Sequence, residues 1–178
     1  MKILYIGSNV KKIASGADAV NKRNELILSQ CQGIELYYFF LEREVNIIDK
    51  FQGYLGGLTH DDIEPIITMI TQEKIDVIFI SHSLLGKLSY IIKKHFPTMK
   101  IITFFHNVEV HYAKEYLRVS GYSRLPFYLL AKYNELYSIK YSDYYLVLNS
   151  RDDKLLQETY CVKSHLILPV SYEDKFEE

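Results

Sequence analysis

The sequence of 178 residues contains no tryptophan, only two cysteines and a formal net charge of −1. Two cysteines without a CxxC spacing are too few for a thiolate metal site or for a disulfide scaffold. The balanced charge removes any global electrostatic argument for binding nucleic acid. No apolar run approaches the roughly 18 residues that a membrane-spanning helix needs. These absences leave a globular domain with local binding sites as the class to consider.

The N-terminal segment also lacks the pattern of a secretory signal. The apolar run within residues 1–7 is too short for one and is typical of a first β-strand. We therefore expect a cytoplasmic protein. Cys31 and Cys161 stand among apolar residues, which predicts buried free thiols. A hydrophobic content of 48% and a charged content of 24% are typical of one globular domain with a sizeable core.

Apolar runs and helical patterns alternate along the whole chain. Strands are predicted at residues 3–6, 34–41, 76–80, 100–105, 144–148 and 164–168. Helices are predicted near residues 17–31, 63–70, 84–92, 108–118 and 126–141, with another opening at a capping box at 150–153. Residues 42–60 are expected to be irregular, their glycines marking a flexible loop. This alternation predicts an α/β fold, a Rossmann-like, doubly wound parallel sheet in a single domain.

The most informative segment is the fourth predicted strand and the polar residues after it. The apolar run 101–105 stops at His106, which Asn107 and Glu109 follow. Ligands of open α/β sheets bind beyond the carboxyl ends of the strands, so we predict that His106 contacts a substrate. His82 ends the third strand and is expected to line the same cleft. The spacing of His106, Glu109 and His111 does not match a known zinc motif, and no metal is expected.

Two further segments allow a functional and a structural interpretation. The loop 7–16 joins the first strand to a helix, where free amides and the helix dipole favour a phosphate. It matches neither G-x-G-x-x-G nor a Walker motif, so a plain turn stays equally open. Residues 114–132 mix basic and large apolar side chains. They fit either a peripheral membrane contact or an ordinary pair of helices packed on the sheet.

Together these segments resemble the N-terminal half of a retaining, GT-B-fold glycosyltransferase of family 4. The residues that carry the resemblance are the strand 1–6, the loop Ser15-Gly16-Ala17, the strand 101–105 followed by His106-Asn107, the segment 144–152 and the segment 166–169. The loop departs from the Gly-Gly that is common in the family. The segment Pro169-Val-Ser stands where the family often has Pro-Asn-Gly.

The resemblance implies transfer of a sugar from a nucleotide-sugar donor to a saccharide or lipid-linked acceptor, with retention and with no metal or other cofactor. It assigns His106 to the donor sugar as the catalytic residue, and Ser15 and Gly16 to the donor phosphates. Asn107, Glu109 and Arg118 are the predicted acceptor-binding residues. The family's donor-binding C-terminal domain carries an acidic E-x7-E pair, and this sequence contains none.

The chain is thus expected to form one N-terminal, acceptor-side domain over residues 1–170. Residues 171–178 would begin an interdomain linker or a frayed tail. The missing C-terminal donor-binding domain would be its partner, nucleic acid would not, and the domain by itself would be inactive. An alternative is a non-catalytic binding or membrane-anchoring subunit of a split glycosyltransferase, at the inner face of the membrane through residues 114–132. A third hypothesis is a stand-alone nucleotide-binding domain, which the absence of the G-x-G-x-x-G motif disfavours.

Overall fold

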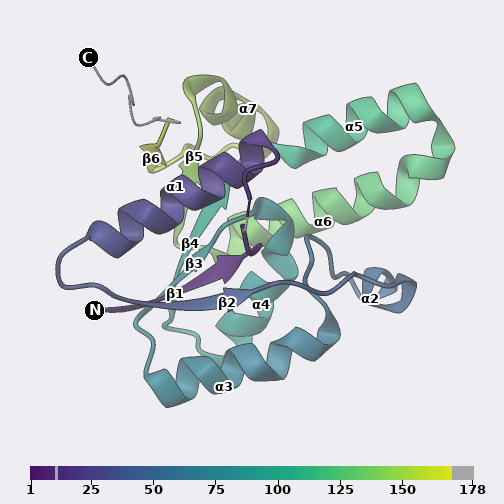
Figure 1. Cartoon of the computed structure of the whole chain (residues 1–178). Coiled ribbons are helices and arrows are strands. Elements are labelled where there is room, and N and C mark those ends of the chain that lie inside the picture. Colours follow the sequence, from purple (N-terminus) through teal and green to yellow (C-terminus); the bar gives the residue numbers. More distant parts are fainter. Residues whose placement is uncertain (11, 170–178) are drawn as a thin grey trace.

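The computed structural model describes residues 1–10 and 12–169 and shows an α/β fold built on one parallel sheet of six strands (Figure 1). The strands are β1 (Lys2–Gly7), β2 (Glu35–Phe40), β3 (Val77–Ile80), β4 (Lys100–Phe105), β5 (Tyr144–Val147) and β6 (Leu166–Ile167). The helices are α1 (Gly16–Gln30), α2 (Ile47–Phe51), α3 (Ile63–Glu73), α4 (Gly86–His95), α5 (Glu109–Ser120), α6 (Leu125–Tyr141) and α7 (Ser150–Tyr160). Three short 3-10 turns are η1 (His60–Asp62), η2 (Ser83–Leu85) and η3 (Tyr122–Arg124).

The strand order is β2-β1-β3-β4-β5-β6. After β1 the chain forms β2 on one side of it and then crosses to form β3 on the other. The order therefore reverses between β1 and β3, and the crevice beyond their carboxyl ends is the expected ligand site of such a sheet. The predicted fold class, a doubly wound parallel sheet, is confirmed.

The central strands are apolar throughout because helices cover both faces of the sheet. Leu4 of β1 pairs in register with Ile78 of β3, and both point to the face covered by α3 and α4. Tyr5 and Phe79, the next pair along, point to the opposite face, which α1 covers. Their rings stack at 5.6 Å between centroids. The one-residue alternation explains why these strands read as continuous apolar runs.

Helix α6 lies directly against α4 through the glycine that begins α4. A side chain at Gly86 would place its Cβ only 1.8 Å from the carbonyl oxygen of Asn134 on α6. The Asn134 side chain accepts a hydrogen bond from the amide of Lys87 and donates one to the carbonyl of Gly53, each at 3.0 Å. This close approach fixes α6 against the start of α4. Among the described residues, no helix is both long and apolar enough to cross a membrane.

The prediction of an irregular, flexible segment over residues 42–60 is wrong. The segment contains α2, which begins with a reciprocal capping box between Asn46 and Asp49. The glycines adopt positive φ angles and pack, Gly53 against the ring of Tyr133, for example. Leu58 is fully buried in the main core. The glycines therefore serve tight turns of a packed loop rather than a mobile lid.

Both cysteines are exposed, so their predicted burial is also wrong. Each lies at the C-cap of a helix, Cys31 after α1 and Cys161 after α7, where the chain turns away from the core. Helix α7 is capped by the side chain of Asn149, which accepts from the amide of Asp152, rather than by Ser150. The predicted linker or tail at residues 171–178 lies outside the described residues.

Candidate functional site

Polar side chains meet at the carboxyl ends of β1, β3 and β4, where the strand order reverses and the crevice of such a sheet is expected. Gly7 ends β1, and any side chain there would collide with Ser81, whose Oγ would lie 2.1 Å from the added Cβ. Ser81 and His82 follow β3, and His106 follows β4. The glycine therefore allows the residue after β3 to lie across the end of β1.

His106 is almost fully buried, with 4% of its surface exposed. Its Nε2 lies 2.8 Å from the carbonyl oxygen of Ser81 and 2.9 Å from Oδ1 of Asn21 on α1. A carbonyl only accepts hydrogen bonds, so Nε2 carries the proton and the neutral ring keeps a lone pair on Nδ1. Burial lowers the pKa of His106 to about 4, with the nearby cation of Arg23 acting in the same direction. The ring is therefore neutral at pH 7.

A second imidazole stacks on the first. The rings of His82 and His106 lie 5.3 Å apart and 22° from parallel. Nδ1 of His82 accepts a hydrogen bond from the amide of Leu84 at 3.1 Å, which leaves Nε2 to face Oε1 of Glu109 at 3.7 Å. Burial, and secondly the neighbouring His106, lower the pKa of His82. Two neutral imidazoles are thus stacked at the strand ends, and the carboxyl group of Glu109 lies beside that of His82.

Glu109 is the group in this cluster that titrates near neutral pH. Only 8% of it is exposed, and burial raises its pKa to about 7. Repulsion from Glu135 acts in the same direction, while the amide of Asn107, 3.4 Å from Oε1, acts against it. A carboxyl group with such a pKa can take up or release a proton under physiological conditions. Beside a neutral imidazole it forms a candidate acid–base pair.

The beginning of α5, which carries Glu109, is held by a carboxylate from α6. Its N-cap, Val108, offers no side-chain hydrogen bond. Instead Oε1 of Glu135 accepts from the Glu109 amide at 2.7 Å, and Oε2 accepts from the Val110 amide at 3.0 Å. The hydroxyl groups of Ser83 and Tyr160 also donate to this carboxylate, at 3.1 and 2.7 Å.

Glu135 is fully buried, and burial raises its pKa while these four hydrogen bonds oppose the shift. Glu135 is not among the site residues that the sequence predicted. It is a positioning residue that fixes the first turn of α5 beside His82.

The loop before α1 begins at the carboxyl end of β1, at the same edge of the sheet. Ser15 is the N-cap, and its hydroxyl accepts from the amide of Asp18 at 3.2 Å and donates to the Asp18 carboxylate at 2.8 Å. This hydrogen bond, and that from the amide of Ala14, lower the pKa of Asp18. The structure gives the amides of Gly16 and Ala17 no acceptor within residues 1–10 and 12–169. Backbone donors, rather than the Ser15 hydroxyl, are thus available to an anion.

Most of the predicted site residues come together, but one does not. His106, Asn107 and Glu109 lie at the junction of β4 and α5, and the hydrogen bond between His106 and Asn21 joins them to α1. Arg118 lies in the last turn of α5, about 13 Å along the helix from Glu109. Its partner is Glu115, at 3.8 Å, and its guanidinium is exposed. Arg118 therefore lies apart from the residues at the strand end.

The three potential ligands of the segment 106–111 point in different directions. His106 bonds to Ser81 and Asn21, Glu109 faces His82, and His111 bonds to Oγ1 of Thr159 at 2.7 Å. Across the described part of the chain, no three His, Cys, Asp or Glu residues are grouped so that they could hold a metal ion.

Comparison with known proteins gave no family model that matches the chain and no matching curated protein.

Proposed function

We propose that this chain is the acceptor-side domain of a retaining, GT-B-fold glycosyltransferase of family 4. In this proposal a donor-binding domain, in the same polypeptide or in a separate subunit, holds the nucleotide-sugar across the crevice. The acceptor is a saccharide or a lipid-linked saccharide on the cytoplasmic side. The reaction as proposed uses no metal or other cofactor.

The observation that carries the proposal is the position of His106 in the crevice between the strand ends and α1. The resemblance assigns the donor sugar to His106 and the donor phosphates to the loop at Ser15 and Gly16, which lie far apart in the sequence. In the structure, Asn21 on the second turn of α1 bonds directly to His106. One bound nucleotide-sugar would thus meet both.

His106 acts in this proposal as a neutral hydrogen-bond acceptor. Its Nε2–H is engaged by Ser81 and Asn21, so the lone pair on Nδ1 is the group left for a sugar hydroxyl. A fixed neutral imidazole contributes a preorganised dipole near the anomeric carbon, where positive charge develops in the transition state. The two hydrogen bonds at Nε2 keep the ring from turning away.

The acceptor lies on the other side of the same histidine, against His82 and Glu109. Glu109, whose pKa is about 7, takes the proton of the acceptor hydroxyl in its carboxylate form. The new glycosidic bond forms as the bond from the anomeric carbon to the donor phosphate breaks, and the nucleoside diphosphate leaves with the electron pair. Asn107, which is exposed and bonds to Glu109, offers its amide to an acceptor hydroxyl. Arg118 has no part in this arrangement.

The test measures sugar transfer from a panel of nucleotide-sugars by the protein together with its donor-binding partner, using mass spectrometry of the product. His106→Ala should lower kcat by about 10²-fold, the usual cost of one preorganised transition-state contact. His106→Gln keeps a donor for the Ser81 carbonyl and should fold like the parent, yet lose similar activity. His95→Ala is the control, since His95 is exposed on α4 and, among the described residues, is hydrogen-bonded only to the carbonyl of Ile91. No transfer from any nucleotide-sugar, or equal activity of His106→Ala and His95→Ala, would refute the proposal.

Membrane anchoring is a second candidate function, because two apolar tips are exposed. Phe51 of α2 is 88% exposed, as are Val119 (84%) and Tyr122 (89%) at the turn between α5 and α6. Both tips project to the right of the sheet in Figure 1. Exposed basic side chains accompany them, namely Lys50, Lys114, Arg118, Arg124 and Lys132. Apolar tips with surrounding cations suit the interface of an anionic bilayer.

This second function predicts co-sedimentation of the protein with phosphatidylglycerol vesicles and weaker binding to phosphatidylcholine vesicles. The double variant Val119→Ser/Tyr122→Ser should lose most of the bound fraction. Leu26→Ser, an exposed apolar site on α1, should retain it. Equal sedimentation of both variants would refute the membrane contact.

A further inference from the structure

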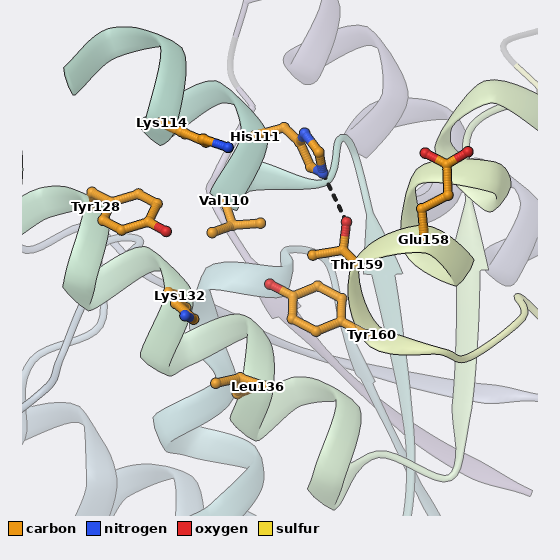
Figure 2. Close-up of a pocket in the computed structure, with 9 residues that line it drawn as sticks. All are labelled: Val110, His111, Lys114, Tyr128, Lys132, Leu136, Glu158, Thr159 and Tyr160. Carbon is orange, nitrogen blue, oxygen red and sulfur yellow. Dashed lines mark hydrogen bonds between the residues drawn. The ribbon is translucent and has the colours of Figure 1, made fainter. Parts of the chain in front are cut away.

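A pocket of about 340 Å³ lies between α5, α6 and α7, beside the crevice (Figure 2). Residues from all three helices line it, among them Val110, His111, Lys114, Tyr128, Lys132 and Tyr160. Its volume is at the lower end of the range for small-molecule sites, which suits one substituted sugar ring better than a dinucleotide. The acid–base pair of the crevice is not part of this pocket.

The polar groups of the pocket favour an anion. Lys114 and Lys132 come from facing helices, and neither makes an ion pair with any described residue. The single carboxylate in the lining is that of Glu158, and Figure 2 shows it directed away from both lysines. His111 also lines the pocket, and its Nε2 is bonded to Oγ1 of Thr159 at 2.7 Å. Two unpaired ammonium groups at one pocket attract an oxyanion.

The remaining walls are aromatic and aliphatic. The rings of Tyr128 and Tyr160 and the side chains of Val110 and Leu136 line the pocket. Apolar walls with a few polar groups at fixed positions are the usual composition of a small-ligand site. The pocket thus combines surfaces for the carbon skeleton of a ring with cations for one charged substituent.

The pocket and the crevice share one carboxylate. Oε2 of Glu135 accepts from the Val110 amide and the Tyr160 hydroxyl, which belong to residues lining the pocket. Oε1 accepts from the amide of Glu109 and the hydroxyl of Ser83, which belong to the crevice. The first turn of α5 therefore separates the pocket from the crevice. A ligand in the pocket lies next to the residues that hold the proposed acid–base group.

We infer that this pocket binds a sugar carrying an oxyanion, a phosphate or a carboxylate, as a subsite for the acceptor. The role as an acceptor subsite rests on the proposed function, whereas the binding of an anionic sugar rests on the pocket alone. The two lysines bind the oxyanion, and Tyr128 and Tyr160 contact the ring. Specificity for a charged acceptor would then come from α5 and α6.

The experiment is an NMR titration of the full chain, following the imidazole signals of its histidines. Glucose 6-phosphate and glucuronate are the anionic probes, with glucose and inorganic phosphate as controls. At least one anionic sugar should bind with a Kd of about 1 mM and shift His111 selectively, at least about tenfold more tightly than glucose or phosphate. Which of the two sugars binds identifies the oxyanion as phosphate or carboxylate.

Variants locate the binding. Lys114→Met/Lys132→Met should weaken it at least about tenfold, and both lysines are exposed, so the variant should fold. Lys154→Met, an exposed lysine of α7 outside the pocket lining, should bind like the parent. Equal affinity for glucose or for phosphate alone, no shift of His111, or full binding by the double variant would each overturn the inference. Sugar binding without any transfer activity would refute the proposed function and leave the pocket assignment standing.

Discussion

Replacement of Glu135 by glutamine is the sharpest test of how the site is held together. The change keeps the shape of the side chain but turns one oxygen into an NH2 group. The hydroxyl groups of Ser83 and Tyr160 can rotate to accept from this group, but the backbone amides of Glu109 and Val110 cannot. Whichever way the amide turns, one buried backbone N–H loses its acceptor.

The size of the effect follows from these contacts. An unpaired buried donor costs about 1–3 kcal/mol, and loss of the negative charge at the start of α5 removes about 1 kcal/mol more. Relief of the buried charge offsets about 1 kcal/mol of this, so we expect Glu135→Gln to lower the free energy of unfolding by about 1–3 kcal/mol. Tyr160→Phe removes one hydrogen bond of the four and should cost about 1 kcal/mol.

Equilibrium urea unfolding at neutral pH, followed by circular dichroism, measures these losses. Glu115→Gln is the matched control, since Glu115 is an exposed glutamate of α5 whose one ion pair within residues 1–10 and 12–169 is with Arg118. Its change should stay within about 0.5 kcal/mol. A similar, small loss for Glu135→Gln would refute the reasoning. It would mean that Glu135 carries a proton in the folded protein and that α5 is not held by its charge.

Three other predictions address the titration, the packing and the surface. Because the pKa of Glu109 is raised from 4.5 to about 7, the folded state holds a proton that the unfolded state releases between these two pH values. The stability that protonated Glu109 contributes to the fold is therefore fully present below about pH 4.5 and is lost as the pH rises to 7. Urea unfolding should therefore find Glu109→Gln equal to the parent at about pH 4 and more stable by on the order of 3 kcal/mol at about pH 8, and equality at both would contradict the shift. Gly86→Ala should lower the melting temperature strongly, because the added methyl group meets the backbone of α6. At Gly16 an added Cβ has no atom within 4 Å, so Gly16→Ala should raise the free energy of unfolding by about 0.5–1 kcal/mol. A thiol reagent should titrate Cys31 and Cys161 rapidly in the folded protein, and reaction only on unfolding would contradict their exposure.

The strands were predictable because helices cover both sheet faces, which makes each central strand a continuous apolar run. Tyr5, for example, is as fully buried as its neighbour Leu4 although their side chains point to opposite faces. The place of His106 was predictable for the same reason, since the run before it stops where the sheet ends. The exposure of Cys161 was not, because a helix end turns the chain away from the core in a way that local hydrophobicity does not record.

The role of Glu135 lay beyond sequence reasoning. Helix α6 carries apolar residues on most of its sides, so its pattern does not mark the buried face, and a glutamate in it reads as exposed. The partners of its carboxylate lie 25 to 52 residues away along the chain. Such contacts depend on the tertiary packing of α5 and α6, for which the sequence offers no local signal.

The cap that α6 supplies to α5 also has a consequence for how this region forms and opens. Helix α5 has no side-chain cap of its own, so before α6 docks its first turn is expected to fray. The two helices should then fold as one cooperative unit. In native-state hydrogen exchange, the amides of Glu109 and Val110 should be protected together and exchange only when that unit opens.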